Sequence, residues 1–198
     1  SFWLFLKFLK EIKVKLKYMF LNFTKDFFER DPKIVAIELL GNFLVRKIKN
    51  KIFISKIVET EAYYGFNDPA SRVYKGIKNY NKAMIMDPGI AFIYMVHSNW
   101  LLNVVAHPKN EIGAVLIRAV EPLNFKADTS GPGKLTKALK IDKSFNEKSL
   151  LDTNSELFLA INNDKGKIEI GYSKRIGVKK DLDVYLRFFI KNNKFVSK

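Results

Sequence analysis

Two glutamates and a tyrosine occupy alternate positions in SKIVETEAYYGFNDPAS, residues 55–71, as Glu59, Glu61 and Tyr63. The β-branched pair before them predicts a strand, and the Asp-Pro pair after them predicts a turn. Because alternate residues of a strand share a face, the three side chains are expected to point the same way. Two carboxylates and an aromatic ring make a poor core, so this face belongs either to a wet surface or to a site.

Glu61 has two interpretations on the residues alone. It is either a solvated or ion-paired strand residue, or a general base that activates a water molecule. Together with Glu59 it also has the composition of a glycosidase carboxylate pair. Such pairs stand roughly 5 Å or 6.5–9.5 Å apart across a sugar. Same-face glutamates are common on strands, so the pair by itself is a weak signal.

Arg118 interrupts the apolar run AVLIRAVEPL. A buried arginine is costly unless it meets an anion or a carboxylate. One interpretation is a core ion pair with Glu59, Glu61 or Glu121. The other is a site arginine that fixes a carboxylate or a phosphate. The residues alone do not separate the two.

Three further features could bind nucleic acid. Basic residues and tyrosines are interleaved at 72–82, where phosphates would take the lysines and bases would stack on the rings; a solvated loop is the plainer interpretation. The glycines of SGPGKL, 130–135, could present N–H groups to phosphate at a helix start, although the spacing is not that of a P-loop. Asn103 lies in an apolar strand, where a satisfied core amide is the commoner role.

Most of the elements that must position these residues are predicted to be strands. A short helix is predicted over 31–41, with proline at its first position and glycine past its end. Thr24 is a possible N-cap of an earlier helix. The predicted strands are 42–48 and 51–63 joined at 49–51, a hairpin with His97, Ser98 and Asn99 at its tip, 113–123, and a final pair within 175–198. Few crossover helices separate them, which favours an α+β fold with a largely antiparallel sheet.

Composition excludes several classes of site. The chain has 198 residues, enough for one domain with a substantial core, and no cysteine, which excludes a disulfide framework and a thiol nucleophile. Two histidines leave little for a metal site. The formal charge of +15, from 35 basic and 20 acidic residues, favours a polyanionic partner, nucleic acid first and acidic membrane second.

The opening SFWLFLKFLKEIKVKLKYMF is too short and too rich in lysine to span a bilayer, and it lacks the pattern of a secretory signal. The chain begins with Ser1, and Met19 would make a sensible initiator. Residues 1–18 are therefore interpreted as an extension that could be upstream, non-native sequence, before a single domain at 19–198.

Several segments, taken together and in this order, resemble the alkyladenine (3-methyladenine) DNA glycosylase family from about residue 20 onward. They are FFERDPKIVAIELLGNFLVRKI, KIVETEAYYGFNDPAS, MDPG, LLNVVA, GAVLIRAVEPL, SGPGKLTKAL and RIGV. The resemblance implies a monofunctional enzyme of base excision repair without metal or cofactor, acting on duplex DNA inside the cell. It also implies a curved sheet with a β-hairpin that protrudes toward DNA. Such enzymes flip a damaged purine into a pocket and hydrolyse its N-glycosidic bond with water.

The resemblance assigns roles to residues of this chain. Glu61 would be the general base, and Arg118 would help to hold the attacking water. Tyr63 would stack on the flipped base. Tyr94 and Phe92 match pocket aromatic positions.

One further matching position concerns selectivity: Asn103 matches an asparagine thought to oppose the exocyclic amine of normal guanine. Apart from the resemblance, the basic stretch at 72–82 and the SGPGKL segment supply the possible phosphate contacts, which are Lys75, Lys78, Lys82 and Lys134.

Three departures from the family pattern bear on substrate range. Arg72 stands where the family usually carries a histidine, and its charge beside a cationic lesion would shift preference toward neutral lesions unless the loop has moved. His97 stands where the family places an intercalating tyrosine, which predicts weaker trapping of the flipped base. The connection EPLNFKADTSGPGKL is shorter than usual, which should alter the DNA-facing rim or stability more than the chemistry.

Two alternatives belong to other classes. A non-catalytic, damaged-DNA-binding descendant of the same fold would bind duplex DNA without base release. An amphipathic membrane-surface protein would rest on residues 1–18 and the charge.

Overall fold

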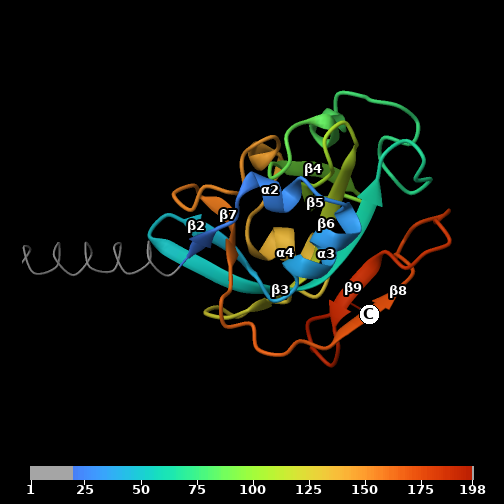
Figure 1. Cartoon of the computed structure of the whole chain (residues 1–198). Coiled ribbons are helices and arrows are strands. Elements are labelled where there is room, and N and C mark those ends of the chain that lie inside the picture. Colours follow the sequence, from blue (N-terminus) through green and yellow to red (C-terminus); the bar gives the residue numbers. More distant parts are fainter. Residues whose placement is uncertain (1–19, 198) are drawn as a thin grey trace, which may run out of the picture.

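The longest strand, β3 (Lys51–Tyr64), carries both glutamates and organises the sheet. The computed structural model describes residues 20–197, so the expected extension at 1–18 lies outside the described residues. Along one edge β3 pairs with β6; along the other it pairs first with β2 and then, around Glu59–Glu61, with β9. The strand order is β1-β7-β2-β3-β6-β5-β4, with β8 beyond β9, and every pairing is antiparallel (Figure 1). The other strands are β1 (Leu21–Asn22), β2 (Phe43–Ile48), β4 (Ala91–Val96), β5 (Asn99–Val105), β6 (Gly113–Pro122), β7 (Leu157–Ile161), β8 (Ile170–Ser173) and β9 (Arg187–Ile190).

Short helices flank this sheet, which confirms the predicted α+β class. They are α2 (Lys25–Phe28), α3 (Pro32–Leu39), α4 (Pro132–Ala138) and the 3-10 turns η1 (Lys82–Ile85) and η2 (Lys143–Phe145). The predicted helix at 31–41 forms as α3, with Pro32 at its start and Asp31 accepting a hydrogen bond from the Lys33 amide as N-cap. Thr24 holds the N-cap position of α2 but makes no side-chain cap bond.

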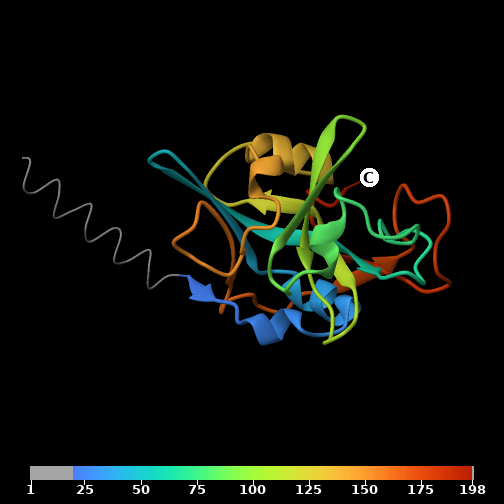
Figure 2. The ribbon, with the colours of Figure 1, turned by 90° about the horizontal axis from the view of Figure 1, so that it is seen from above.

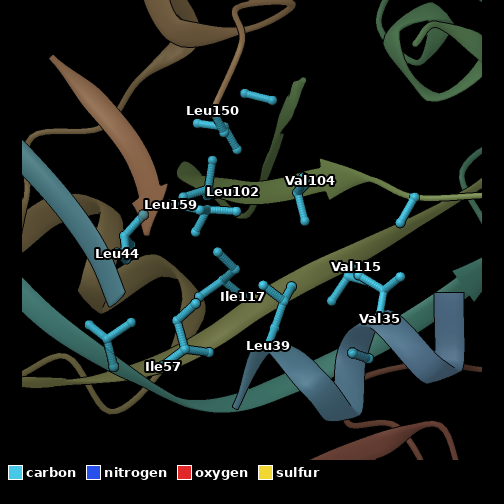
Figure 3. Packing of buried hydrophobic residues seen from close by; sticks show 14 of the residues in the cluster. Val35, Leu39, Leu44, Ile57, Leu102, Val104, Val115, Ile117, Leu150 and Leu159 are labelled. Carbon is cyan, nitrogen blue, oxygen red and sulfur yellow. The ribbon is translucent and has the colours of Figure 1, made fainter. Parts of the chain in front are cut away.

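One face of the sheet packs on α3 and α4 to form the main core. Figure 3 shows Val35 and Leu39 of α3 beside Val115 and Ile117 of β6, all fully buried. Each such side chain contributes about 1.5–3 kcal/mol by leaving water. A second apolar cluster lies apart from this core and includes Phe92 together with Val73, Ala83 and Met84 of the β3–β4 connection. Partly buried Tyr63 packs against this second cluster, which places the cluster beside the candidate site.

The register between β3 and β6 is broken where the charged residues lie. Ile57 pairs with Val120 and Thr60 with Ile117, and shifts on both sides of Glu59 leave Arg118 without a partner in the ladder. A β-bulge of this kind bends a strand and redirects a side chain. Here it places Arg118 between the two glutamates.

The hairpin of β4 and β5 protrudes from the body (Figure 2). Its turn has two residues, His97 and Ser98, and Asn99 is already the first residue of β5, so the three-residue tip predicted from sequence was wrong. Both turn residues have positive φ, 45° and 60°. That conformation belongs to the two-residue turn whose twist matches a hairpin.

The prediction that both strands of the final pair lie within 175–198 was also wrong. Only β9 lies within 175–198, and its partner β8 precedes that range. The predicted strand at 113–123 forms as β6, and 42–48 and 51–63 form as β2 and β3. Across residues 20–197, the chain contains no helix with the length and apolarity that a bilayer crossing requires.

Candidate active site

Strand register brings residues far apart in sequence onto one face of the sheet. Glu61 pairs with Leu116 on β6, Leu116 with Asn103 on β5, and Asn103 with Phe92 on β4. Paired residues point to the same side of a sheet, so these four make one row across four strands. Because side chains alternate, Tyr63, Arg118 and Tyr94 lie on the same face in the flanking rows. The structure therefore gathers the base-pocket candidates of β3, β4 and β5 with both proposed catalytic residues.

Glu61 is completely buried and fully engaged. Its Oε1 accepts a hydrogen bond from the Ile176 amide at 2.8 Å and lies 3.2 Å from Nη1 of Arg118. Its Oε2 accepts from the Tyr63 hydroxyl at 2.7 Å. A carboxylate with donors on both oxygens is held in one orientation, and Oε2 keeps a lone pair for a further donor.

Burial raises the pKa of Glu61 above its ordinary value of 4.5, and nearby Glu59 acts in the same direction. The Arg118 charge, the Ile176 amide and the Tyr63 hydroxyl offset part of that increase. Burial, and next the Glu61 charge, raise the pKa of Tyr63 well above its ordinary value, so Tyr63 remains a neutral donor. A carboxyl group with a raised pKa is a stronger proton acceptor than an exposed one once it is ionised.

Glu59 is fully buried beside Arg118 and is not a surface residue. Its Oε1 accepts from Nε of Arg118 at 2.8 Å and from Nε of Arg187 at 2.7 Å. Its Oε2 accepts from the Ser197 amide at 2.7 Å. Glu121, the third possible partner of Arg118, instead pairs with Lys56 at 2.6 Å. Arg118 is thus both a core ion pair and a direct neighbour of Glu61.

Arg175 of the RIGV segment ties two loops together above β3. It forms a bidentate pair with Asp68, both bonds being 2.7 Å, and also binds Asp181. Burial acts to lower the pKa of Arg175, but the two carboxylates outweigh it and leave that pKa raised. The guanidinium also lies 4.5 Å over the Tyr63 ring. Figures 1 and 2 both place the loop after β3 beside the loop between β8 and β9.

The aromatic part of the face is covered by the loop after β3. The guanidinium of Arg72 lies 4.6 Å over the ring of Tyr94, which itself stands 5.0 Å from Phe92. Arg72 is exposed, whereas Tyr94 and Phe92 are buried. Buried Asn81 braces the loop through its side chain, which donates to the Arg72 carbonyl at 2.8 Å. Arg72 therefore contacts the predicted pocket.

Asn103 is buried, and its amide group donates to the Phe92 carbonyl across the strands at 3.0 Å. This bond gives the Asn103 NH₂ group the partner expected of a satisfied core amide. It also fixes the amide on the face that carries Glu61.

His97 is exposed and lies in the turn at the tip of the hairpin. Helix α4 supports the hairpin: the Thr136 hydroxyl donates to the Trp100 carbonyl at 2.7 Å. Gly133 of the SGPGKL segment lets Asn99 approach, because an added Cβ would lie 2.7 Å from the Asn99 Cβ. A small pocket of about 150 Å³ opens beside this support rather than at Glu61. The glycine thus has a packing role; phosphate binding by the segment stays a prediction.

The four predicted phosphate-binding lysines are exposed but differ in their surroundings. Lys134 Nζ lies 2.8 Å from a carboxylate oxygen of Asp128, and Lys82 Nζ lies 3.6 Å from one of Glu147. Within residues 20–197, neither Lys75 nor Lys78 has a carboxylate at salt-bridge distance. These two are the better placed to meet phosphate.

The arrangement places a buried carboxylate, which in its ionised form can accept a proton, beside a cluster of aromatic side chains. Sequence reasoning found Glu61, Arg118 and the aromatic residues but missed the supporting Arg187, Asp68 and Arg175. A signal existed for two of them, since Asp68 lies in KIVETEAYYGFNDPAS and Arg175 in RIGV, both among the matched segments. Arg187 interrupts the apolar run VYLRFFI, as Arg118 interrupts AVLIRAVEPL, so the signal that identified Arg118 was available for Arg187 too.

The chain is similar to known proteins over most of its length. Residues 26–194 match the family model described as methylpurine-DNA glycosylase (MPG). A relative from Aeropyrum pernix is 39% identical over 178 residues, covering 88% of this chain and 92% of the relative. A relative from Borrelia garinii subsp. bavariensis is 44% identical over 185 residues, covering 87% and 97%. Both are provisionally named 3-methyladenine DNA glycosylase.

Asp68→Asn should lower the free energy of unfolding by about 3 kcal/mol, because it removes one carboxylate from a buried arginine. Both side chains of the Asp68–Arg175 pair are fully buried. Urea unfolding followed by circular dichroism measures the change. The matched control is Asp183→Asn, which removes a fully exposed partner of Lys174 and should change stability far less. Equal effects of the two substitutions would contradict the structural role given to Arg175.

Proposed function

Because the chain belongs to the methylpurine-DNA glycosylase family, we propose that it flips damaged purines out of duplex DNA and hydrolyses their N-glycosidic bonds with water activated by Glu61. Family membership makes it a DNA glycosylase, a hydrolase of N-glycosyl bonds that serves DNA repair. The observation that carries the proposal is the buried Glu61 carboxylate, oriented by Arg118, Tyr63 and the Ile176 amide. It lies on the face that holds the aromatic residues.

In the proposed reaction, Glu61 takes a proton from water as the water oxygen bonds to C1′ of the sugar. The bond from C1′ to the base nitrogen breaks, and its electron pair leaves with the base. A hydroxylated abasic sugar remains. A cationic lesion such as 3-methyladenine or 7-methylguanine leaves as a neutral base and needs little acid assistance. A neutral lesion such as hypoxanthine must gain a proton, which makes it the harder substrate.

The flipped base is proposed to stack against Tyr63 and the Phe92–Tyr94 pair. Asn103 would oppose the exocyclic amine of normal guanine. His97 at the hairpin tip would enter the duplex and fill the gap that flipping leaves. Arg72 now lies over Tyr94, so it must move aside or pack on the entering base.

Duplex DNA is the proposed partner. We propose that the chain binds it as a monomer, inside the cell. The formal charge of +15 supports this, since phosphate contacts supply most non-specific affinity and make it salt-dependent. The exposed Lys75 and Lys78 are proposed to contribute.

The direct test is Glu61→Gln, which keeps the size of the side chain but removes its basicity. Duplex oligonucleotides carrying hypoxanthine, ethenoadenine or 7-methylguanine are incubated with each protein, and alkali cleaves the abasic products. We expect the variant to bind these duplexes normally and to lose at least about 100-fold in excision rate.

The matched control is Glu38→Gln, an exposed carboxylate outside the site that pairs with Arg30. It should retain excision. Undiminished turnover by Glu61→Gln would contradict the general-base role. Binding without release from any substrate by the unsubstituted chain would favour a damage-binding protein instead.

Activity should require ionised Glu61, so the excision rate should fall as pH falls through its pKa. Because that pKa is raised, the acid limb should lie above pH 4.5. Tyr63→Phe removes a hydroxyl that lowers the Glu61 pKa, so the limb should move to higher pH. Single-turnover rates across pH measure it. Tyr64→Phe is the control, because the Tyr64 hydroxyl binds Asp31 and not Glu61. If Tyr63→Phe leaves the acid limb at the same pH, the Tyr63 hydroxyl does not lower the Glu61 pKa and the argument is contradicted.

Arg72→His should raise the ratio of excision rates for 7-methylguanine over hypoxanthine about three- to tenfold. The reason is that it removes a permanent charge from the pocket that must receive a cationic base. The control, Lys75→Gln, removes a charge from the same loop without touching Tyr94 and should leave the ratio alone. An unchanged ratio for Arg72→His would mean that residue 72 turns away from the bound base.

A further inference from the structure

Ser197 closes the charged cluster behind the site. Its amide donates to Oε2 of Glu59 at 2.7 Å and its hydroxyl donates to Oε1 at 2.8 Å. The same hydroxyl accepts from Nη2 of Arg118 at 3.3 Å, and its carbonyl accepts from Nη2 of Arg187 at 3.1 Å. One half-buried serine thus contacts both arginines and the carboxylate between them.

These contacts fix the direction of Arg118. Its Nε is held by Glu59 and its Nη2 by Ser197. A guanidinium is planar and rigid, so two anchored nitrogens determine where the third lies. That third nitrogen, Nη1, stands 3.2 Å from Oε1 of Glu61. The Arg118 side chain is 8% exposed and the Glu59 side chain is 0% exposed, so water does not compete strongly for these bonds.

The segment that carries Ser197 is itself folded against the sheet. The Phe195 amide donates to the side chain of Asn193 at 3.0 Å, and the Val196 amide donates to the Asn193 carbonyl at 3.2 Å. The Asn193 side chain also donates to Glu121 on β6 at 2.8 Å. The serine therefore arrives on a defined turn.

We propose that Ser197 is a positioning residue, which together with Glu59 and Arg187 orients Arg118 toward the general base. This inference rests on the proposed role of Glu61. Residues 193–197 then belong to the catalytic apparatus, although they lie far along the chain from the motifs that carry the chemistry. The charged and titratable groups around Glu61 that could share the effect are Glu59, Tyr63, Tyr94, Arg118, Arg175 and Arg187.

The test compares single-turnover excision by the full chain and by Ser197→Ala, with DNA affinity measured alongside. We expect a rate about tenfold lower at unchanged affinity. The Arg118 charge lowers the Glu61 pKa, and loss of the Ser197 hydroxyl loosens Arg118. The Glu61 pKa should therefore rise, and the acid limb should also move to higher pH. A residue needed only for stability would not move that limb.

Two controls isolate the route. Ser173→Ala removes a hydroxyl that binds Arg187 at 3.1 Å but does not touch Arg118, so it should lower the rate less and leave the limb in place. In an Arg118→Gln background, Ser197→Ala should lower the rate less than about twofold, since a residue that acts through Arg118 has nothing left to orient.

Circular dichroism and thermal unfolding establish that each variant is folded. If Ser197→Ala is not, Arg187→Lys replaces it, because lysine keeps the charge beside Glu59 but cannot also reach the Ser197 carbonyl. A folded variant with unchanged rate and acid limb overturns the proposal, as does an equal loss in both backgrounds. Full activity of Glu61→Gln would instead overturn the proposed function beneath it.

Discussion

The structure depends on a buried cluster of charges at the junction of β3, β6 and β9. Two carboxylates and two arginines leave water there, which costs several kcal/mol per ion unless hydrogen bonds replace the lost hydration. Glu59 accepts from both arginines and from Ser197, while Glu61 forms an ion pair with Arg118 and accepts from two neutral donors. The bulge at Arg118, the pairing of β9 with β3 and the docking of residues 193–197 all serve that requirement.

The same arrangement separates a fixed part of the proposed site from a more variable one. Glu61, Arg118 and the aromatic residues proposed to stack on the base lie on strands, where register and burial fix them. Two other residues proposed to meet the lesion and the duplex, Arg72 and His97, lie on a loop and a hairpin turn. Loops tolerate substitution more readily than strands, so substrate range can change while the hydrolytic centre is retained. Arg175 and Asp68 link the two parts, because they hold the loop against the strand that carries Glu61.

Much of this could be predicted from the sequence because it depends on local pattern. Period-two alternation identified β3 and placed Glu61 and Tyr63 on one face, and proline and glycine bounded α3. The contacts around Glu59 could not be predicted, because they join residues 59, 118, 187 and 197, whose proximity only register and the bulge decide. Strands β1 and β7 went unnoticed because LN is too short to show a period and LFLAI shows none. The resemblance supplied residue roles that spacing alone left open.

The central claim is that water, and not an amino group of the protein, attacks the sugar. A lysine nucleophile would form a Schiff base with the opened sugar, which borohydride reduces to a permanent protein–DNA link. The measurement is therefore a single-turnover reaction on labelled duplex DNA with borohydride present from the start. The account predicts released base, an alkali-labile abasic strand and no covalent complex. A labelled band at the mass of protein plus DNA, formed in step with base release, would contradict it.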